Sequence, residues 1–218
     1  MLLAFDLDGT LIDSVRDLSR SASELVTNLG GRALSDHEVA AMVGDGAAAL
    51  VQRALTAAGV DSEWPDALEQ FLHIYDRRLL ETTTTYPGIP EALAMVSRRA
   101  RLAVLTNKPR RPTLRLIDAL RLTEYFDEVI AGDSSHGRKP DPAGLNALAR
   151  GEHHVMLVGD SPIDAHTAAA AGSAFAWARY GFSAARFEAT PPDTPYVLDR
   201  PSDLVSVVDR FAAIATGT

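Results

Sequence analysis

Two pairs of aspartates are the residues of this chain best suited to chemistry. Asp6 and Asp8 lie in FDLDGT, directly after an apolar run, and Asp160 and Asp164 lie in VGDSPID. Two unit charges about 4 Å apart interact by roughly 4 kcal/mol at an effective dielectric constant near 20, so clustered carboxylates need a compensating cation. Oxygen ligands in a chain without cysteine favour a hard ion such as Mg²⁺. These residues therefore predict a magnesium site.

The same residues are suited to phosphoryl transfer. A carboxylate beside a metal-held phosphate can attack phosphorus and form an aspartyl-phosphate, and Asp6 has a suitable position for this role. Asp8, two residues further on, would protonate the leaving oxygen and later deprotonate water. Lys139 and the Thr106 hydroxyl would stabilise charge on the transferring oxygens, while Gly9 would let the backbone approach closely.

Short apolar runs that alternate with helical patterns must position these residues. We expect strands at 2–6, 102–106, 128–131, 154–159, 174–178 and 196–198, and helices at 90–100, 110–120, 142–150, 163–171 and 202–215. This alternation predicts an α/β fold with a doubly wound, mainly parallel, Rossmann-like sheet. Ligands bind at the carboxyl ends of the strands in such a sheet, so Asp6, Thr106, the Lys139 loop and Asp160 are able to converge on one site.

The long stretch between the first two expected strands has helical signals only. Helical periodicity occurs at 15–29, 35–42, 46–58 and 64–80. We therefore expect a helical domain at 15–82, inserted into a catalytic core domain formed by 1–14 and 83–218. The stretch TTTTYPGI at 82–89 marks the second junction, because its Pro and Gly interrupt regular structure before a new helix.

Composition narrows the partners of the chain. A formal net charge of -8 over 218 residues argues against nonspecific binding to nucleic acid or an anionic membrane, which leaves small solutes and proteins. The absence of cysteine excludes disulfides and thiolate metal sites. The N-terminus has no basic region followed by a long apolar stretch, and no run of about 18 apolar residues occurs, so we expect a cytoplasmic protein. The sequence leaves the oligomeric state open.

Four segments together resemble the ordered motifs of the haloacid dehalogenase-like hydrolases. They are FDLDGTLIDS, VLTNKP, RKPDP and VGDSPIDAHTAAAAG, and they extend from residue 5 to residue 172. The resemblance implies that Asp6 is the nucleophile and Asp8 the general acid and base, with Thr106 and Lys139 as phosphate stabilisers. It also implies the metal ligands and the substrate contacts. Mg²⁺ would be bound by Asp6, the Asp8 backbone carbonyl and Asp160, with support from Asp164, and the substrate-binding candidates are Gly9, Thr10, Asn107, Lys108 and Gly44.

The inserted helices resemble the C1 cap of that family. Within the family, MVGDGAAALVQRAL at 42–55, YPGI at 86–89 and TNKP at 106–109 are similar to phosphoglycolate phosphatases. This similarity implies a phosphatase that acts on a small phosphorylated metabolite, with 2-phosphoglycolate as the leading candidate. Dehalogenating members lack the second aspartate of the first motif, so Asp8 implies phosphoryl transfer.

Two alternatives remain open at this point. The first is an enzyme like β-phosphoglucomutase, or another member that acts on sugar phosphates or pyrophosphate, since related caps serve these substrates. The second is a receiver-like signalling domain, which also gathers carboxylates, a hydroxyl and a lysine at strand ends. The helical insert and Asp8 disfavour the receiver, because a receiver needs neither a closing cap nor an acid for a departing alcohol.

Overall fold

A parallel sheet of six strands forms the centre of the computed structural model, which describes residues 1–187 and 190–216. The strands are β1 (Leu2–Phe5), β4 (Arg101–Leu105), β5 (Glu128–Ile130), β6 (Val155–Gly159), β7 (Ala174–Ala178) and β8 (Tyr196–Leu198). Their order is β5-β4-β1-β6-β7-β8, so the first strand lies in the middle, with Phe5 level with Val104 on one side and Val158 on the other. The expected α/β class with a parallel, Rossmann-like sheet is confirmed.

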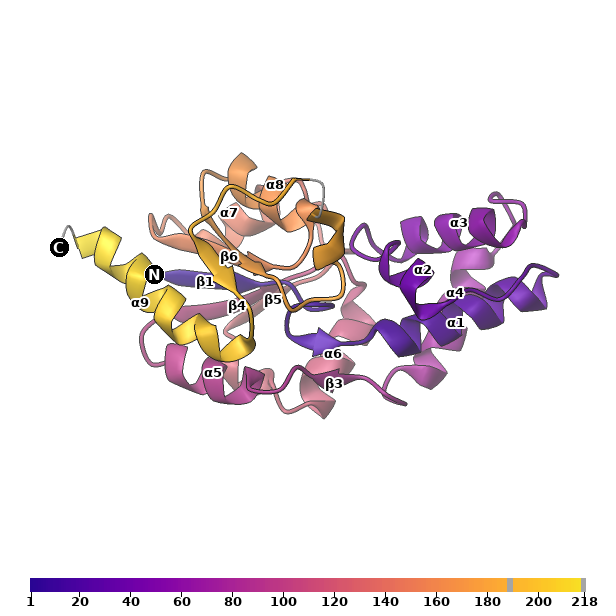
Figure 1. Ribbon diagram of the computed structural model, residues 1–218, viewed down its shortest axis with the longest axis horizontal. Coiled ribbons are helices and arrows are strands. Elements are labelled where there is room, and N and C mark those ends of the chain that lie inside the picture. The colour runs from indigo at the N-terminus through magenta and orange to yellow at the C-terminus, as the bar shows by residue number, and fades with distance from the viewer. Residues whose placement is uncertain (188–189, 217–218) are drawn as a thin grey trace.

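Helices cover both faces of this sheet (Figure 1). Alternate residues of β1 divide between the faces: Leu3 and Phe5 belong to one apolar cluster, and Leu2 and Ala4 to the other. The first cluster includes side chains of α5 (Ile89–Val96), α6 (Arg110–Ala119) and α9 (Leu204–Thr216), and the second includes those of α7 (Ala143–Ala149) and α8 (Pro162–Ala170). Burial on both faces explains why the strands read as continuous apolar runs.

The four helices of the insert lie together beyond one end of the sheet (Figure 1). They are α1 (Val15–Asn28), α2 (Asp36–Ala40), α3 (Ala47–Ala58) and α4 (Ala67–Arg78). A short antiparallel ribbon of β2 (Ile12–Asp13) and β3 (Thr84–Thr85) joins the two ends of the insert. We did not expect this ribbon from the sequence, because strands of two residues carry no periodic signal.

The division into a catalytic core domain, formed by 1–14 and 83–218, and an inserted helical domain at 15–82 stays a prediction. Residues 188–189 and 217–218 of the core domain lie outside the described residues.

A buried carboxylate connects the start of the insert to its end. Asp17, in the first turn of α1, accepts hydrogen bonds from the backbone N–H and the hydroxyl of both Thr82 and Thr83. Burial alone would raise the pKa of Asp17, but these hydrogen bonds hold it below its ordinary value. The ionised side chain therefore ties the segment entering the insert to the segment leaving it.

Helix boundaries differ from expectation where polar or cyclic residues intervene. The helix expected at 90–100 ends at Val96, because the polar residues at 97–99 continue no apolar stripe. The helix expected at 64–80 begins at Ala67, after Pro65 and a left-handed Asp66. Within 1–187 and 190–216, three short 3₁₀ helices were not expected: Thr123–Tyr125, Ala184–Phe187 and Pro201–Asp203. Among the described residues, no helix combines the length and apolar character needed to cross a bilayer.

Candidate active site

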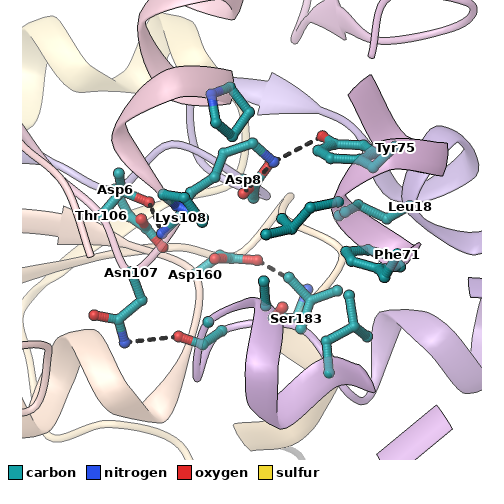
Figure 2. Close-up of a pocket in the computed structure, with 18 residues that line it drawn as sticks. Asp6, Asp8, Leu18, Phe71, Tyr75, Thr106, Asn107, Lys108, Asp160 and Ser183 are labelled. Carbon is teal, nitrogen blue, oxygen red and sulfur yellow. Dashed lines mark hydrogen bonds and ion pairs between the residues drawn. The ribbon is translucent and has the colours of Figure 1, made fainter. Parts of the chain in front are cut away.

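Polar residues collect where the central strands end, next to the helical insert. Asp6 follows β1, Thr106 follows β4 and Asp160 follows β6, while Lys139 comes from the loop between β5 and α7. Together with side chains of the insert, the first three of these residues line a cavity (Figure 2). Parallel strands bring their carboxyl ends to one edge of the sheet, so residues far apart in the sequence meet there.

Three buried aspartates and one lysine form the centre of this site. Asp6, Asp160 and Asp164 each offer an oxygen, and these oxygens lie within 4.8 Å of one another. The ammonium group of Lys139 lies 2.9 Å from Oδ1 of Asp6 and 2.6 Å from Oδ1 of Asp164. One buried lysine therefore faces three buried carboxylates.

The pKa values in this cluster reflect the excess of acid groups. Burial, and then the nearby charge of Asp164, raise the pKa of Asp6 to about 6, although Lys139 opposes this shift. Burial and the neighbouring carboxylates raise the pKa of Asp160 well above its ordinary value. Burial would lower the pKa of Lys139, but Asp164 and Asp6 raise it overall. A hard cation among these oxygens would remove the unbalanced charge, so the cluster fits Mg²⁺.

The start of α8 explains how Asp164 reaches the cluster. Asp164 is the third residue of the helix, and its Oδ2 accepts hydrogen bonds from the Ser161 hydroxyl at 2.6 Å and the Ser161 backbone N–H at 3.1 Å. This capping box aims the other oxygen, Oδ1, at Lys139. Asp164 thus both caps the N-terminus of α8 and contacts the buried lysine.

Asp8 has different partners from the other aspartates. Its carboxylate accepts a hydrogen bond from the Ser14 hydroxyl at 2.5 Å, and the Lys108 ammonium lies 3.1 Å from both of its oxygens. Within the described residues, the aspartates grouped around a possible metal position do not include Asp8. The side chain of Asp8 therefore remains separate from the acidic cluster.

Lys108 joins the core to the helical insert. Its ammonium lies 2.7 Å from the hydroxyl of Tyr75 on α4 and 4.5 Å from the centre of the Tyr75 ring (Figure 2). Burial raises the pKa of Tyr75 to about 12, so its hydroxyl keeps its proton at neutral pH. Burial would lower the pKa of Lys108, but Asp8 and Tyr75 raise it. Sequence reasoning missed Tyr75, because a tyrosine at helical spacing reads as an ordinary core residue.

The Asn107 side chain contacts protein groups on two sides. Its Oδ1 accepts from the Lys139 N–H at 2.8 Å, while Nδ2 donates at 2.9 Å to both the Lys139 and the Gly44 carbonyl oxygens. Arg186, also missed in the sequence, donates to the Val43 carbonyl oxygen at 2.7 Å. These contacts hold the loop before α3 against the core. The substrate-binding roles expected for Asn107 and Gly44 stay predictions.

The first loop of the chain fits closely around Asp160. Gly9 has a φ of +84°, and a Cβ at this position would lie 2.1 Å from Oδ2 of Asp160. The Thr10 hydroxyl lies 3.5 Å from Oδ1 of Asp160, and the Ser183 N–H donates to Oδ2 at 2.8 Å. Thr106 lines the cavity, and its Oγ1 accepts from the Lys108 N–H at 3.2 Å.

Sequence comparisons identify proteins that this chain resembles. Residues 3–178 match the model of the haloacid dehalogenase-like hydrolase family. The chain is 37% identical over 195 residues to a phosphoglycolate phosphatase of Pseudomonas savastanoi, and the alignment covers 85% of this chain and 71% of that protein. It is 40% identical over 192 residues to a phosphoglycolate phosphatase of Nitrosospira multiformis, and the alignment covers 83% of this chain and 84% of that protein.

A solved structure shares the same architecture. The crystal structure of a predicted phosphoglycolate phosphatase from Haemophilus somnus matches with a TM-score of 0.85 and 28% sequence identity. The match covers 95% of this chain and 97% of that one. Agreement over nearly the whole of both chains includes the helices between β2 and β3 as well as the sheet.

Proposed function

This chain belongs to the haloacid dehalogenase-like hydrolase family and is a phosphatase, and we propose that it hydrolyses 2-phosphoglycolate through an aspartyl-phosphate with Mg²⁺ bound. The observation that carries the proposal is the separation of Asp6 from Asp8. Both residues line the cavity, but Asp6 belongs to the acidic cluster, whereas the Asp8 carboxylate forms an ion pair with Lys108. Such a division supports a nucleophile and a separate acid and base.

Asp6 is held in a position suited to attack. Its Oδ1 accepts from the Leu7 N–H at 2.7 Å and faces Lys139, while within the described residues its Oδ2 has no hydrogen-bond partner. We assign the attack on phosphorus to this second oxygen: a bond forms from Asp6 to phosphorus, and the bond from phosphorus to the ester oxygen breaks. Lys139 and the Thr106 hydroxyl offset charge on the phosphoryl oxygens.

Asp8 moves the proton in both half-reactions. In the first, it gives its proton to the departing alkoxide, so the alcohol leaves neutral. In the second, water attacks phosphorus while Asp8 takes a proton from that water, which releases phosphate and restores Asp6. The Asp6, Asp160 and Asp164 carboxylates and the Asp8 backbone carbonyl are the groups that we assign to the metal site. When bound there, Mg²⁺ supplies positive charge to the phosphoryl oxygens.

The insert acts in this proposal as a cap over the reacting groups. It contributes an apolar wall to the cavity, formed by Leu18, Leu50, Phe71 and Leu72 among others. Such a wall excludes water from the intermediate. It also disfavours a sugar phosphate, because sugar hydroxyls buried against apolar side chains would lack hydrogen-bond partners.

Substrate profiling tests this function. The kcat/KM values for 2-phosphoglycolate, β-glucose 1-phosphate, pyrophosphate and a nucleotide should be measured with Mg²⁺ and with EDTA. We expect 2-phosphoglycolate to be among the best substrates, and turnover to require Mg²⁺. Isomerisation of β-glucose 1-phosphate without phosphate release would instead indicate a mutase.

The nucleophile has its own test. Asp6→Asn should abolish turnover, while Asp118→Asn, the same change at an exposed position of α6, should leave it intact. Incubation of the wild type with ³²P-labelled substrate and rapid acid quenching should trap label on the protein. Equal turnover by Asp6→Asn would exclude an aspartyl-phosphate at this residue.

A further inference from the structure

The chain contains 19 arginines but only two lysines, Lys108 and Lys139. Both lysine side chains are buried, with 4% and 2% of their surface exposed; Lys108 contacts one aspartate and Lys139 contacts two. An ammonium is a compact point charge, whereas a guanidinium is a wide planar fork, so lysine suits a confined position beside a small anion. Lys139 is accounted for by the acidic cluster, but Lys108 lies outside it.

Lys108 is the single cationic side chain among the described residues that line the cavity. The insert side of that cavity is apolar apart from the Tyr75 hydroxyl and the backbone of the loop at 43–46. Among these lining side chains, Lys108 is therefore the one that offers a positive charge to a second negative charge on a substrate.

Tyr75 supplies a hydrogen-bond donor at the same place. Its hydroxyl oxygen accepts from Lys108 at 2.7 Å, and within the described residues its own proton has no acceptor. The Tyr75 ring stacks on Phe71, with ring centres 5.8 Å apart and planes inclined by 9°, which restrains its orientation. The ammonium and the hydroxyl together present N–H and O–H donors to an anion.

The position of this pair matches the leaving group. Lys108 contacts both oxygens of Asp8, the residue to which we assign protonation of the ester oxygen. In 2-phosphoglycolate the carboxylate is attached to the carbon that bears this ester oxygen. A substrate oriented with its ester oxygen at Asp8 would therefore carry its carboxylate close to Lys108.

We propose that Lys108 and Tyr75 form the binding site for a carboxylate on the leaving group, and that they give the enzyme its preference for phosphomonoesters of small hydroxy acids. The inference rests on the proposed phosphatase function and adds the residues that select the substrate. Tyr75 lies on the insert and Lys108 on the core, so the two parts of the chain would recognise the carboxylate together.

A pair of matched substrates tests the site. 2-Phosphoglycolate and 2-hydroxyethyl phosphate differ in that a carboxylate replaces a neutral CH₂OH group, so their kcat/KM ratio reports recognition of the carboxylate. We expect the wild type to prefer 2-phosphoglycolate, Tyr75→Phe to reduce the ratio about tenfold, and Lys108→Met to reduce it about a hundredfold. Tyr125→Phe, the same change on a 3₁₀ helix outside the cavity, should leave the ratio unchanged.

The ratio separates recognition from a merely structural role. If Lys108 only positions Asp8, its replacement will slow both substrates equally and leave the ratio unchanged, which would overturn the inference. A wild type that prefers 2-phosphoglycolate, with Tyr75→Phe and Lys108→Met retaining that preference, would refute the inference and leave the proposed function intact. A wild type without any preference would reject the proposed substrate as well.

The two lysines allow a direct binding readout. In ¹⁵N-lysine-labelled Asp6→Asn with Mg²⁺, the side-chain ammonium signals can be assigned by the loss of one signal in Lys108→Met. We expect the Lys108 signal to shift with 2-phosphoglycolate considerably more than with 2-hydroxyethyl phosphate. Equal shifts with the two compounds would contradict a carboxylate site at Lys108.

Discussion

Lys139 Nζ lies 2.6 Å from Oδ1 of Asp164, and both side chains are almost completely buried. Asp164 simultaneously accepts two hydrogen bonds from Ser161 on its other oxygen. A carboxylate can accept on both sides at once, whereas an amide presents a donor on one side. The geometry of Lys139 at Asp6 therefore depends on a side chain at position 164 that accepts hydrogen bonds on both of its terminal atoms.

Asp164→Asn should lower activity and stability together. We expect kcat to fall about a hundredfold, because Lys139 loses its orientation, and the free energy of unfolding to fall by about 3 kcal/mol. Steady-state kinetics and urea unfolding measure both effects. Asp203→Asn is the matched control, because Asp203 occupies the same capping position on a partly exposed 3₁₀ helix. Equal losses in the two variants would contradict a special role for Asp164.

The stability of the metal-free protein should depend on the ionisation of Asp6. The pKa of Asp6 is raised from 3.8 to about 6 by burial, so between about pH 4 and 6 the folded chain keeps a proton that the unfolded chain releases. The Asp6 contribution to the free energy of unfolding is therefore present at low pH and is lost as the pH rises through this window, by up to about 3 kcal/mol. The free energy of unfolding of the wild type minus that of Asp6→Asn, measured by urea unfolding in EDTA, should fall as the pH rises over that range.

Magnesium should restore the stability that the metal-free protein loses as Asp6 ionises. A cation binds the ionised carboxylates and stabilises the folded chain by mass action, so Mg²⁺ should raise Tm at pH 7.5 and have little effect at pH 4.5. Thermal unfolding with Mg²⁺ and with EDTA at the two pH values checks this expectation. A Tm that Mg²⁺ leaves unchanged at pH 7.5 would argue against a metal site at the acidic cluster.

Gly9→Ala should disrupt the site rather than the fold in general. Its Cβ would lie 2.1 Å from Oδ2 of Asp160, so Asp160 or the loop must move, and we expect Mg²⁺-dependent activity to be lost. Gly30→Ala is a close control, since Gly30 also has a φ of +84° but no atom lies within 4 Å of its added Cβ. That variant should lose about 1 kcal/mol from backbone strain and remain active. Full activity in Gly9→Ala would contradict the close packing of Gly9 against Asp160.

Asp17→Asn should loosen the base of the insert. The amide cannot accept hydrogen bonds from Thr82 and Thr83 on both of its terminal atoms, so we expect a loss of about 3 kcal/mol in the free energy of unfolding at pH 7. Because the pKa of Asp17 is lowered, this contribution should disappear as the pH falls below the ordinary range of aspartate. Asp13→Asn, the same change at an exposed position, should cost less than about 1 kcal/mol.

Periodicity was sufficient to predict the central architecture. Buried strands such as 155–159 are continuous apolar runs, and the helices between them carry apolar stripes, so the order of elements follows from local sequence. Helix ends were less predictable, because capping at positions such as Asp66 depends on backbone conformations that composition does not specify. The ribbon of β2 and β3 escaped prediction for a related reason, since its pairing joins residues separated by the whole insert.

The sequence by itself determined the type of chemistry and the fold class, because strand alternation and the ordered DxD, TNK, RKP and GDxxxD segments are local features. Tertiary structure decided which groups act together. It placed the Asp8 carboxylate with Lys108 instead of with the acidic cluster, and it brought Tyr75 from the insert to the same lysine. Those contacts depend on how α4 packs against α1 and α3, and that packing is the sum of many weak apolar contacts between distant residues.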